Sequence, residues 1–377
     1  MGSIPPAGTS FLSFWFGFPP LNYFPGVQCR IAGMRILLST CALICLAATA
    51  ASAQSQAASW QVQTSDVDTN LRGVSVARAT DSSAGPVVWA CGSHGVVLRS
   101  GDGGKTWERV DVADAATLDF RSIQAFGAEA AYVMSIGPGA ASRIYKTTDA
   151  GKHWTLEYEA GRKEIFLDDL VCASEKNCYA VSDPVDGKFL LLHTSDGTNW
   201  QELSQDGMPA ALPGEGIFAA SGTSLAVSKN AIYFVTGGAK TARVFRSKDR
   251  GKSWSVFDTP ILSGNASSGI FSIAQNGNKI VIVGGDYKNV TSAERVAAYS
   301  SDGGANWKLA EAGPSGFRSA VAFVDGSTVI AVGPSGEDIS RDGGAHWTAT
   351  GSLNLNAVAV FVSRAWGVGS KGTIATF

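Results

Sequence analysis

The sequence is poor in charge. Charged residues make up 16% of its 377 residues, against about 25% in a typical soluble domain, and the formal net charge is −2. Lysine and arginine are scattered along the chain, so no basic stripe is present that would neutralise the phosphates of a nucleic acid. We therefore expect no nucleic-acid partner.

Motifs for metals and redox cofactors are also missing. The sequence holds 6 cysteines and 4 histidines, and their spacing does not indicate a zinc site. It contains no Cys-x-x-Cys pair, no haem-attachment motif and no glycine-rich dinucleotide fingerprint that follows a strand and opens a helix. We expect no cofactor and no metal, and an oxidoreductase is the least favoured class.

One apolar segment near the N-terminus has the length and composition of a targeting sequence. Residues 34–53, MRILLSTCALICLAATAASA, contain Arg35, an apolar core at 36–48 and the small residues 51–53 before Gln54. This order is typical of a secretory signal peptide, and the run is too short and too rich in small residues for a good membrane span. We expect an exported protein, periplasmic or secreted, that does not span a membrane.

Residues 1–33 combine proline, glycine and aromatic residues without periodicity. Met34 directly precedes the signal-like segment, so we expect it to be the true start and residues 1–33 to be an over-extended gene model. A disordered leader is the alternative. The folded domain is expected to span residues 54–377.

Export to an oxidising compartment bears on the cysteines. Cys172 and Cys178 flank a polar turn between two apolar runs in LVCASEKNCYAV. They can therefore face each other across a hairpin, and a disulfide between them is predicted. Cys91 lies in the apolar run VVWACG and is interpreted as a buried small hydrophobic residue.

What the sequence does have is an octapeptide repeated along the chain. SGDGGKTW, at 100–107, recurs as TTDAGKHW, SKDRGKSW, SSDGGANW and SRDGGAHW, and in a shortened form as TSDGTNW. The repeated aspartates are 47, 47, 53, 53 and 40 residues apart, a length that suits one four-stranded propeller blade. The repeated pairs are Asp102 and Trp107, Asp149 and Trp154, Asp196 and Trp200, Asp249 and Trp254, Asp302 and Trp307, and Asp342 and Trp347.

Strand-like runs precede and follow each copy, so each copy is expected to form the turn between the third and fourth strands of a blade. The glycine at the fifth position supplies a positive φ at low steric cost. The aspartate and the serine or threonine can bond to backbone groups of the turn, and the tryptophan can wedge between neighbouring sheets. All three roles are structural, and a catalytic group repeated six times around a ring has no chemical rationale.

The ends of the chain complete the count of blades. After the sixth copy, AWGVGSKGTIATF matches VWACGSHGVVLRS of the first unit, so a seventh unit supplies three strands and then stops. The missing fourth strand is expected in SWQVQT, which contains Trp60. We predict an all-β fold, a single seven-bladed β-propeller of four-stranded blades closed by an N-terminal strand. A monomer is expected.

The octapeptide resembles the BNR or Asp-box repeat, S-x-D-x-G-x-x-W, over residues 59–377. The third copy departs from it, since its aspartate and tryptophan are one residue closer. The length of the single ring and the style of its blades resemble the photosystem II stability/assembly-factor-like propellers, which share the sialidase-superfamily fold. This resemblance implies an exported protein that acts by binding a protein partner or a small ligand, because the repeat itself reports fold and not chemistry.

Binding in a propeller is expected at the channel mouth, where the inner strands start and the loops between second and third strands lie. Arginines recur at inner-strand starts, and acidic residues stand at the matching place in the third unit. Polar turns and one glutamate before the fourth unit add further candidates. The candidate residues are Arg72, Arg121, Arg318, Asp168, Asp169, Asp183, Glu215, Asp286, Tyr287, Ser335 and Asp338.

The resemblance also carries an alternative, a sialidase-like glycoside hydrolase. In it Arg72, Arg121 and Arg318 would hold a substrate carboxylate. Glu215 and Tyr287 would form the nucleophile pair and Asp338 would be the acid. The Arg-Ile-Pro motif of sialidases is absent, and Arg–Asp pairing across the channel is an equally good role for these residues. We expect a binding protein rather than an enzyme.

Overall fold

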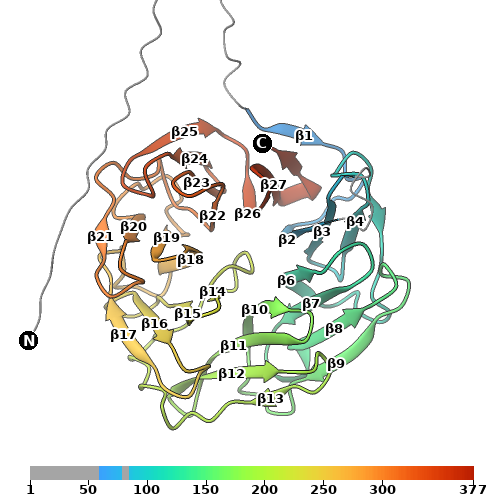
Figure 1. Ribbon diagram of the computed structural model, residues 1–377, viewed down its shortest axis with the longest axis horizontal. Coiled ribbons are helices and arrows are strands. Elements are labelled where there is room, and N and C mark those ends of the chain that lie inside the picture. Colours follow the sequence, from blue (N-terminus) through green and yellow to red (C-terminus); the bar gives the residue numbers. More distant parts are fainter. Residues whose placement is uncertain (1–58, 79–84) are drawn as a thin grey trace, which may run out of the picture. The chain divides into compact units, whose positions relative to one another are not determined.

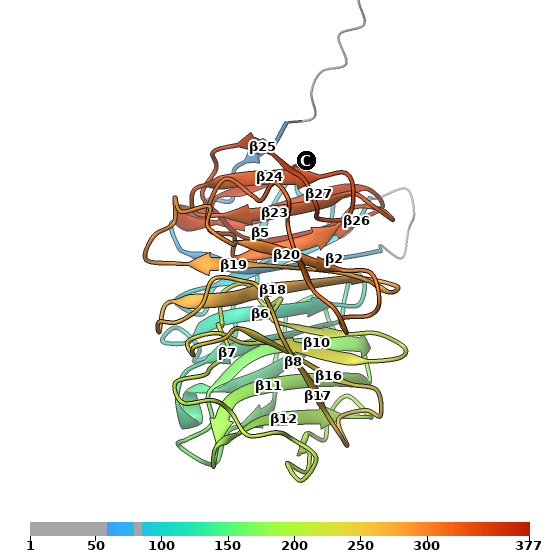
Figure 2. The same cartoon turned by 90° about the vertical axis from the view of Figure 1, so that its left-hand side faces the viewer.

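The computed structural model describes residues 59–78 and 85–377, within one compact unit, Gln56–Phe377. The expected signal peptide and residues 1–33 lie outside the described residues. Seven four-stranded antiparallel sheets surround a central channel (Figure 1). Figure 2 shows the same ring from its side. The predicted all-β, seven-bladed architecture is confirmed.

Each blade is a meander that runs outward from an inner strand at the channel. Blade 1 is β2 (Leu71–Ala77), β3 (Val87–Gly92), β4 (Val97–Ser100) and β5 (Glu108–Arg109). Blade 2 is β6 (Asp119–Ala125), β7 (Ala131–Ile136), β8 (Arg143–Thr147) and β9 (Thr155–Glu159). Blade 3 is β10 (Leu167–Ser174), β11 (Asn177–Val185), β12 (Lys188–Thr194) and β13 (Gln201–Glu202). Blade 4 is β14 (Leu225–Val227), β15 (Ile232–Val235), β16 (Arg243–Ser247) and β17 (Ser255–Asp258).

The remaining blades follow the same order, except that the last one takes its outer strand from the N-terminal end. Blade 5 is β18 (Ser268–Asn276), β19 (Lys279–Asp286), β20 (Ala297–Ser300) and β21 (Lys308–Leu309). Blade 6 is β22 (Ala320–Phe323), β23 (Val329–Gly333), β24 (Gly336–Ser340) and β25 (Trp347–Gly351). Blade 7 is β26 (Leu355–Phe361), β27 (Arg364–Gly369), β28 (Ile374–Thr376) and β1 (Gln61–Gln63). Two short 3-10 helices, η1 (Gly139–Ala141) and η2 (Ser370–Gly372), lie in turns.

The N-terminal strand closes the ring. Strand β1 pairs with β28 in antiparallel register, from Gln61 opposite Thr376 onward, and the two lie side by side in Figure 1. The Trp60 ring packs on Phe377 with the ring centroids 5.3 Å apart. The ends of the sequence therefore meet in one sheet, as the sequence predicted.

The aspartates of the Asp-box turns are all hydrogen-bonded within their turns. In the first, the Asp102 carboxylate accepts hydrogen bonds from Ser100 Oγ (2.8 Å) and from the Thr106 N–H (3.0 Å). Gly104 has φ +95°, a conformation that glycine adopts without steric cost, and its carbonyl accepts the Trp107 indole N–H at 3.0 Å. In every copy the Ser or Thr hydroxyl bonds to the aspartate, and the aspartate accepts a backbone N–H. The box aspartates therefore hold turns.

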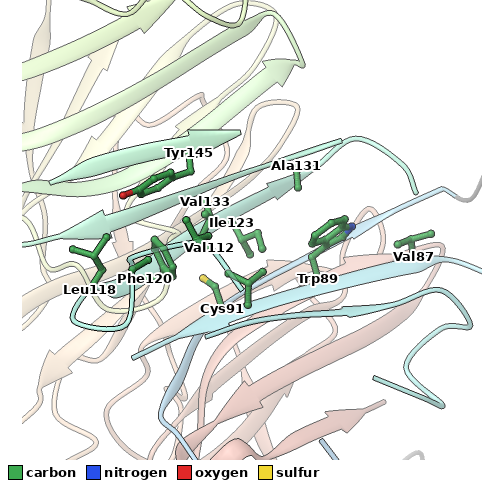
Figure 3. Packing of buried hydrophobic residues seen from close by; sticks show 12 residues of the cluster. Val87, Trp89, Cys91, Val112, Leu118, Phe120, Ile123, Ala131, Val133 and Tyr145 are labelled. Atoms are coloured by element: carbon green, nitrogen blue, oxygen red, sulfur yellow. The ribbon is translucent and has the colours of Figure 1, made fainter. Parts of the chain in front are cut away.

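The hydrophobic core lies between neighbouring blades. Figure 3 shows one such cluster, in which Trp89 of blade 1 and Val133 of blade 2 share a buried layer. Trp154 of the second box packs edge-on against Trp89, with centroids 6.2 Å apart. Among the box tryptophans Trp347 is buried, and the other five are partly buried. The box tryptophan thus wedges between sheets.

The cysteines of the described residues have different environments. Cys172 and Cys178 are opposite each other in the β10–β11 hairpin and are joined by a disulfide. Cys91 is a buried free thiol, and burial raises its pKa, so it stays uncharged. In residues 59–78 and 85–377 there is no helix of the length and apolarity that crossing a membrane requires.

Candidate functional site

Five of the seven inner strands have a β-bulge near their start. In each of them the register skips one residue between two paired neighbours. A bulged residue leaves the ladder, and its side chain is re-aimed. All five skipped residues line one cavity of about 640 Å³ at the channel mouth. They are Arg72, Arg121, Asp168, Phe271 and Asn356.

Blade 6 contributes Ser319 at the corresponding place. The Leu170 N–H donates to Ser122 Oγ of the preceding blade (3.3 Å), and the Val321 N–H donates to Ser272 Oγ in the same way (3.0 Å). Val321 of blade 6 is therefore equivalent to Leu170 of blade 3. The bulge residue Asp168 lies two positions before Leu170, so its counterpart in blade 6 is Ser319. Ser319 also lines the cavity.

Blade 4 breaks the pattern because its inner strand, β14, has only 3 residues. The segment before it, 217–224, crosses the channel, and Figure 1 shows this loop reaching toward the centre of the ring. The Ala219 carbonyl accepts a hydrogen bond from Arg121 Nη1 (2.9 Å), and Ser221 Oγ donates to the Ser319 carbonyl (2.8 Å). Residues 217–220 line the mouth cavity, so this crossing segment forms part of its wall.

Two arginines stand on one side of the cavity. Arg72 Nη1 donates to Asn356 Oδ1 at 3.3 Å, and Arg121 Nη2 donates to Asp119 Oδ2 at 2.6 Å. The Nε of Arg72 and that of Arg121 are buried and find no acceptor among the described residues. Burial, and then the charge of Arg121, lower the pKa of Arg72 to about 10, so it remains charged at neutral pH. The pair has donors available for a carboxylate or a phosphate.

Two carboxylates line the cavity on blade 3. Asp168 is 1% exposed, and its Oδ2 accepts no hydrogen bond from the described residues. Burial, followed by the nearby carboxylates of Asp183 and Asp169, raises the pKa of Asp168 well above its usual value. Burial also raises the pKa of Asp183, whose Oδ1 accepts the Ile217 N–H at 2.9 Å.

Asp169 has a structural position instead. Its carboxylate accepts hydrogen bonds from Ser122 Oγ of blade 2 (2.8 Å) and from the Leu225 N–H of blade 4 (2.8 Å). Burial raises its pKa to about 6. Asp169 therefore joins three blades and does not line the mouth cavity.

An aromatic cluster forms a further wall of the cavity. The rings of Phe218 and Phe271 stack in parallel at 3.9 Å, and Phe317 meets Phe271 edge-on at 4.6 Å. Tyr287, which is 45% exposed, lies 6.1 Å from Phe271 between ring centroids. This wall offers an apolar surface beside the charged groups.

The structure places Arg318 away from the mouth cavity. It is fully buried, its Nε donates to Asp338 Oδ2 at 2.6 Å, and its Nη1 donates to Ser335 Oγ at 3.0 Å. The letters FRS at 317–319 match FRS at 120–122, but in the fold Ser319 takes the place of Arg121. A shift of one residue turns a side chain to the other face of a strand, so the expected convergence of three arginines does not occur.

Glu215 and Asp286 also lie apart from the mouth cavity. Both carboxylate oxygens of Glu215 bind the Arg243 guanidinium, and Thr236 Oγ1 donates to it at 2.7 Å. The lining of the mouth cavity includes Tyr287 but not Glu215. Asp286 accepts the Lys288 N–H at 2.9 Å in the turn after β19.

Of the six residues at the bulge positions and their equivalent, sequence reasoning missed three: Phe271, Ser319 and Asn356. None resembles an arginine or an aspartate in chemistry, so residue type alone did not select them. The signal that finds them is position, because each occupies the bulge of its inner strand or the equivalent place. Aligning the blades by strand register, and not by letters, would have placed all six together.

The fold and this cavity define a seven-bladed β-propeller with a polar and aromatic pocket at its channel mouth. The chain belongs to the family described as the DUF6242 beta propeller domain, whose family model matches residues 96–330. No curated protein matches the sequence.

Solved structures resemble this fold at low sequence identity. One, described as YCF48 bound to D1 peptide, is 16% identical with a TM-score of 0.61, and the match covers 85% of this chain and 97% of that one. Another, YCF48 from Cyanidioschyzon merolae, is 17% identical with a TM-score of 0.62, and the match covers 85% and 99% of the two chains. At these identities the similarity shows the fold alone.

Proposed function

We propose that the protein is an exported binding propeller that holds a segment of a protein partner in its mouth cavity. The observation that carries this proposal is the convergence of bulge residues from separate blades on one pocket of about 640 Å³. Five inner strands aim a side chain there, and a sixth adds Ser319. A volume of this size suits a few residues of a peptide or one small ligand.

The chemistry of the pocket specifies what it would bind. The free Nε–H groups of Arg72 and Arg121 favour an anionic group, such as an aspartate, a glutamate or a chain-terminal carboxylate. The wall of Phe218, Phe271 and Phe317 favours an apolar side chain next to that anion. YCF48, a propeller similar in fold, is described as bound to a D1 peptide, which supports a peptide as the ligand class here.

Binding is proposed here in preference to glycoside hydrolysis because of where the acidic residues lie. A Tyr–Glu nucleophile pair requires hydrogen-bond contact between its members. Glu215 is instead held by Arg243, and Asp338 is held by Arg318. Neither carboxylate lines the cavity that contains Tyr287, so the residues of the hydrolase hypothesis have other partners.

The test is a selection of random peptides displayed against the folded protein, followed by affinity measurement on variants. We expect enriched peptides that carry a carboxylate and an apolar residue, with affinity falling about tenfold or more in Arg72→Met and Arg121→Met. Arg109→Met is the matched control, because Arg109 is an exposed arginine on the outer strand β5. Selected peptides that bind all three variants like the parent would contradict the proposal.

Export is the second part of the proposal. It is supported by the signal-like segment 34–53 and by the disulfide between Cys172 and Cys178, since disulfides persist in oxidising compartments. We expect N-terminal sequencing of the protein from its native host to begin near Gln54, in the periplasmic or secreted fraction. Full-length protein confined to the cytosol would refute export and leave peptide binding to be judged on its own.

A further inference from the structure

The arginine pair of blades 1 and 2 accounts for an anion in the mouth cavity but not for the two carboxylates of the neighbouring blade 3. Asp168 and Asp183 line the same cavity, and a buried carboxylate without a cation is costly. The nearby arginines have other partners: Arg72 donates to Asn356, and Arg121 pairs with Asp119, Arg243 with Glu215 and Arg318 with Asp338. No salt bridge to a described residue reaches Asp168 or Asp183, so neither carboxyl group has a cationic partner among the described residues.

The unused acceptor of Asp168 is the strongest sign of a missing ligand group. The residue is 1% exposed, and Oδ2 has no donor among the described residues. Buried polar atoms are almost always paired in proteins, so an orphaned oxygen next to a cavity calls for an explanation. The bulge in β10 aims this side chain at the cavity.

A second cavity continues from the first past these carboxylates. It has a volume of about 590 Å³, and it shares Phe166 and Asp183 with the mouth cavity. Its other lining includes Glu164 and residues 211–215, with no lysine, arginine or histidine among the described lining residues. Asp183 therefore stands where a chain bound at the mouth would leave across blade 3.

We propose that Asp168 and Asp183 form a subsite for a cationic group of the bound partner, a lysine or arginine side chain or a peptide amino terminus. This inference rests on the proposed function and adds the polarity of the ligand. The anionic group lies against Arg72 and Arg121, and the cationic group lies against blade 3. The partner segment is thus bipolar, with an acidic group for blades 1 and 2 and a basic group for blade 3, beside an apolar residue for the aromatic wall.

A metal ion is a weaker occupant for the same carboxylates. Ca²⁺ and Mg²⁺ take six or more oxygen ligands, with several from protein carboxylates or carbonyls. The described residues contain no cluster of three or more side chains suited to hold a metal ion. An ammonium or guanidinium group needs only two acceptors placed as these are.

The experiment compares two kinds of small probe that differ in one charge. The 4-, 6- and 8-carbon ω-amino carboxylates are measured against the simple alkyl carboxylates of equal length, by ligand-observed NMR titration. We expect at least one amino carboxylate to bind about tenfold tighter than its match. In Asp168→Asn and Asp183→Asn this preference falls to near unity, while alkyl carboxylate binding is kept or strengthened. Asp286→Asn is the control, because Asp286 lies outside the cavity.

The outcomes separate this inference from the proposed function. Alkyl carboxylates that bind through Arg72 and Arg121, with no gain from the ammonium at any length, overturn the cationic subsite and leave the anion site standing. If neither kind of probe binds, both are overturned. A preference that survives in both Asp→Asn variants, or Mg²⁺ that displaces the amino carboxylate, also overturns the subsite. Thermal melting of each variant confirms that it is folded.

Discussion

The Asp-box turns at the rim and the bulge positions at the channel mouth both recur from blade to blade, but their carboxylates are paired differently. At the rim the residues are nearly identical, and each aspartate accepts a hydroxyl and a backbone N–H. At the mouth the residues are two arginines, an aspartate, a phenylalanine, a serine and an asparagine. Three of their polar atoms are buried without a partner: Arg72 Nε, Arg121 Nε and Asp168 Oδ2.

This difference separates the residues that hold the fold from those that are free to specialise. A turn must satisfy its own backbone groups whatever the protein does, so each copy keeps the same short list of residue types. A bulge residue has left the ladder, so the fold does not dictate its chemistry. At the mouth, Arg72, Arg121 and Asp168 each have an unpaired polar atom beside one cavity, where a ligand would pair them.

The largest effect is expected from opening the ring, on which both regions depend. A variant that begins at residue 67 lacks β1 and Trp60, and leaves β28 as an exposed edge that invites pairing between molecules. We expect it to aggregate or to melt far below the parent, as followed by light scattering and calorimetry. Val62→Ala is the control, because Val62 is 61% exposed on the same strand. A monomeric truncation with parental melting would refute the closure.

The rim should respond to loss of a box tryptophan according to its burial. Trp347 is 7% exposed, so Trp347→Ala should lower the free energy of unfolding by about 3–5 kcal/mol. Trp254 is only partly buried, although it packs on Phe234 with centroids 5.0 Å apart, and its loss should cost about half as much. Urea denaturation measures both. If either variant had the same free energy of unfolding as the parent, that tryptophan would not stabilise the fold.

The Cys172–Cys178 disulfide should have a moderate effect on the fold and none on the mouth. It closes a short loop, with a sequence separation of 6, so Cys172→Ala/Cys178→Ala should lose about 2–3 kcal/mol of stability. Ligand affinity should not change, since neither residue lines the cavity. Mass spectrometry that finds both thiols free in exported protein would reject the bridge.

The smallest effect is a difference in pH dependence between the two regions. Hydrogen bonds from the Ser253 side chain and backbone lower the pKa of Asp249 to about 2, from 3.8. Its contribution is present above pH 3.8 and is lost as the pH falls toward 2. Burial raises the pKa of Asp169 to about 6, from 3.8, so stability rises as the pH falls from 6 toward 3.8. From these two groups, stability should therefore be greatest near pH 4.

Two variants separate these contributions. Asp168→Asn removes a carboxylate whose pKa is raised by burial and neighbouring carboxylates, so it should increase the melting temperature at pH 8 more than at pH 4. Asp249→Asn should reduce it at pH 7 and have little effect at pH 2. Identical pH profiles for both variants would contradict the distinction between rim and mouth.

The sequence predicted the fold almost completely, because the residues that form each Asp-box turn are contiguous in the sequence. The spacing of the six aspartates indicated the length of one blade. The match between AWGVGSKGTIATF and VWACGSHGVVLRS indicated a seventh blade that lacks one strand, which the N-terminal strand supplies. The site was predicted only in part: of the candidates, Arg72, Arg121, Asp168, Asp183 and Tyr287 line the cavity. Arg318 does not line it. The same motif, FRS, occurs at 120–122 and 317–319, but the two copies differ by one residue in strand register, so Ser319 takes the position of Arg121. The segment 217–224, which crosses the channel, is not part of the repeat, so the repeat could not predict it.

Hydrogen–deuterium exchange with and without a selected peptide tests the distinction between mouth and rim most directly. The account predicts slower exchange on binding at the mouth, in the inner-strand starts 119–122 and 166–169 and in the crossing segment 217–220. It predicts unchanged exchange in the box turns, such as 100–107 and 247–254, and in the hairpin tip 228–231 outside the mouth cavity. Protection confined to the box turns or to 228–231, with none at the mouth, would contradict it.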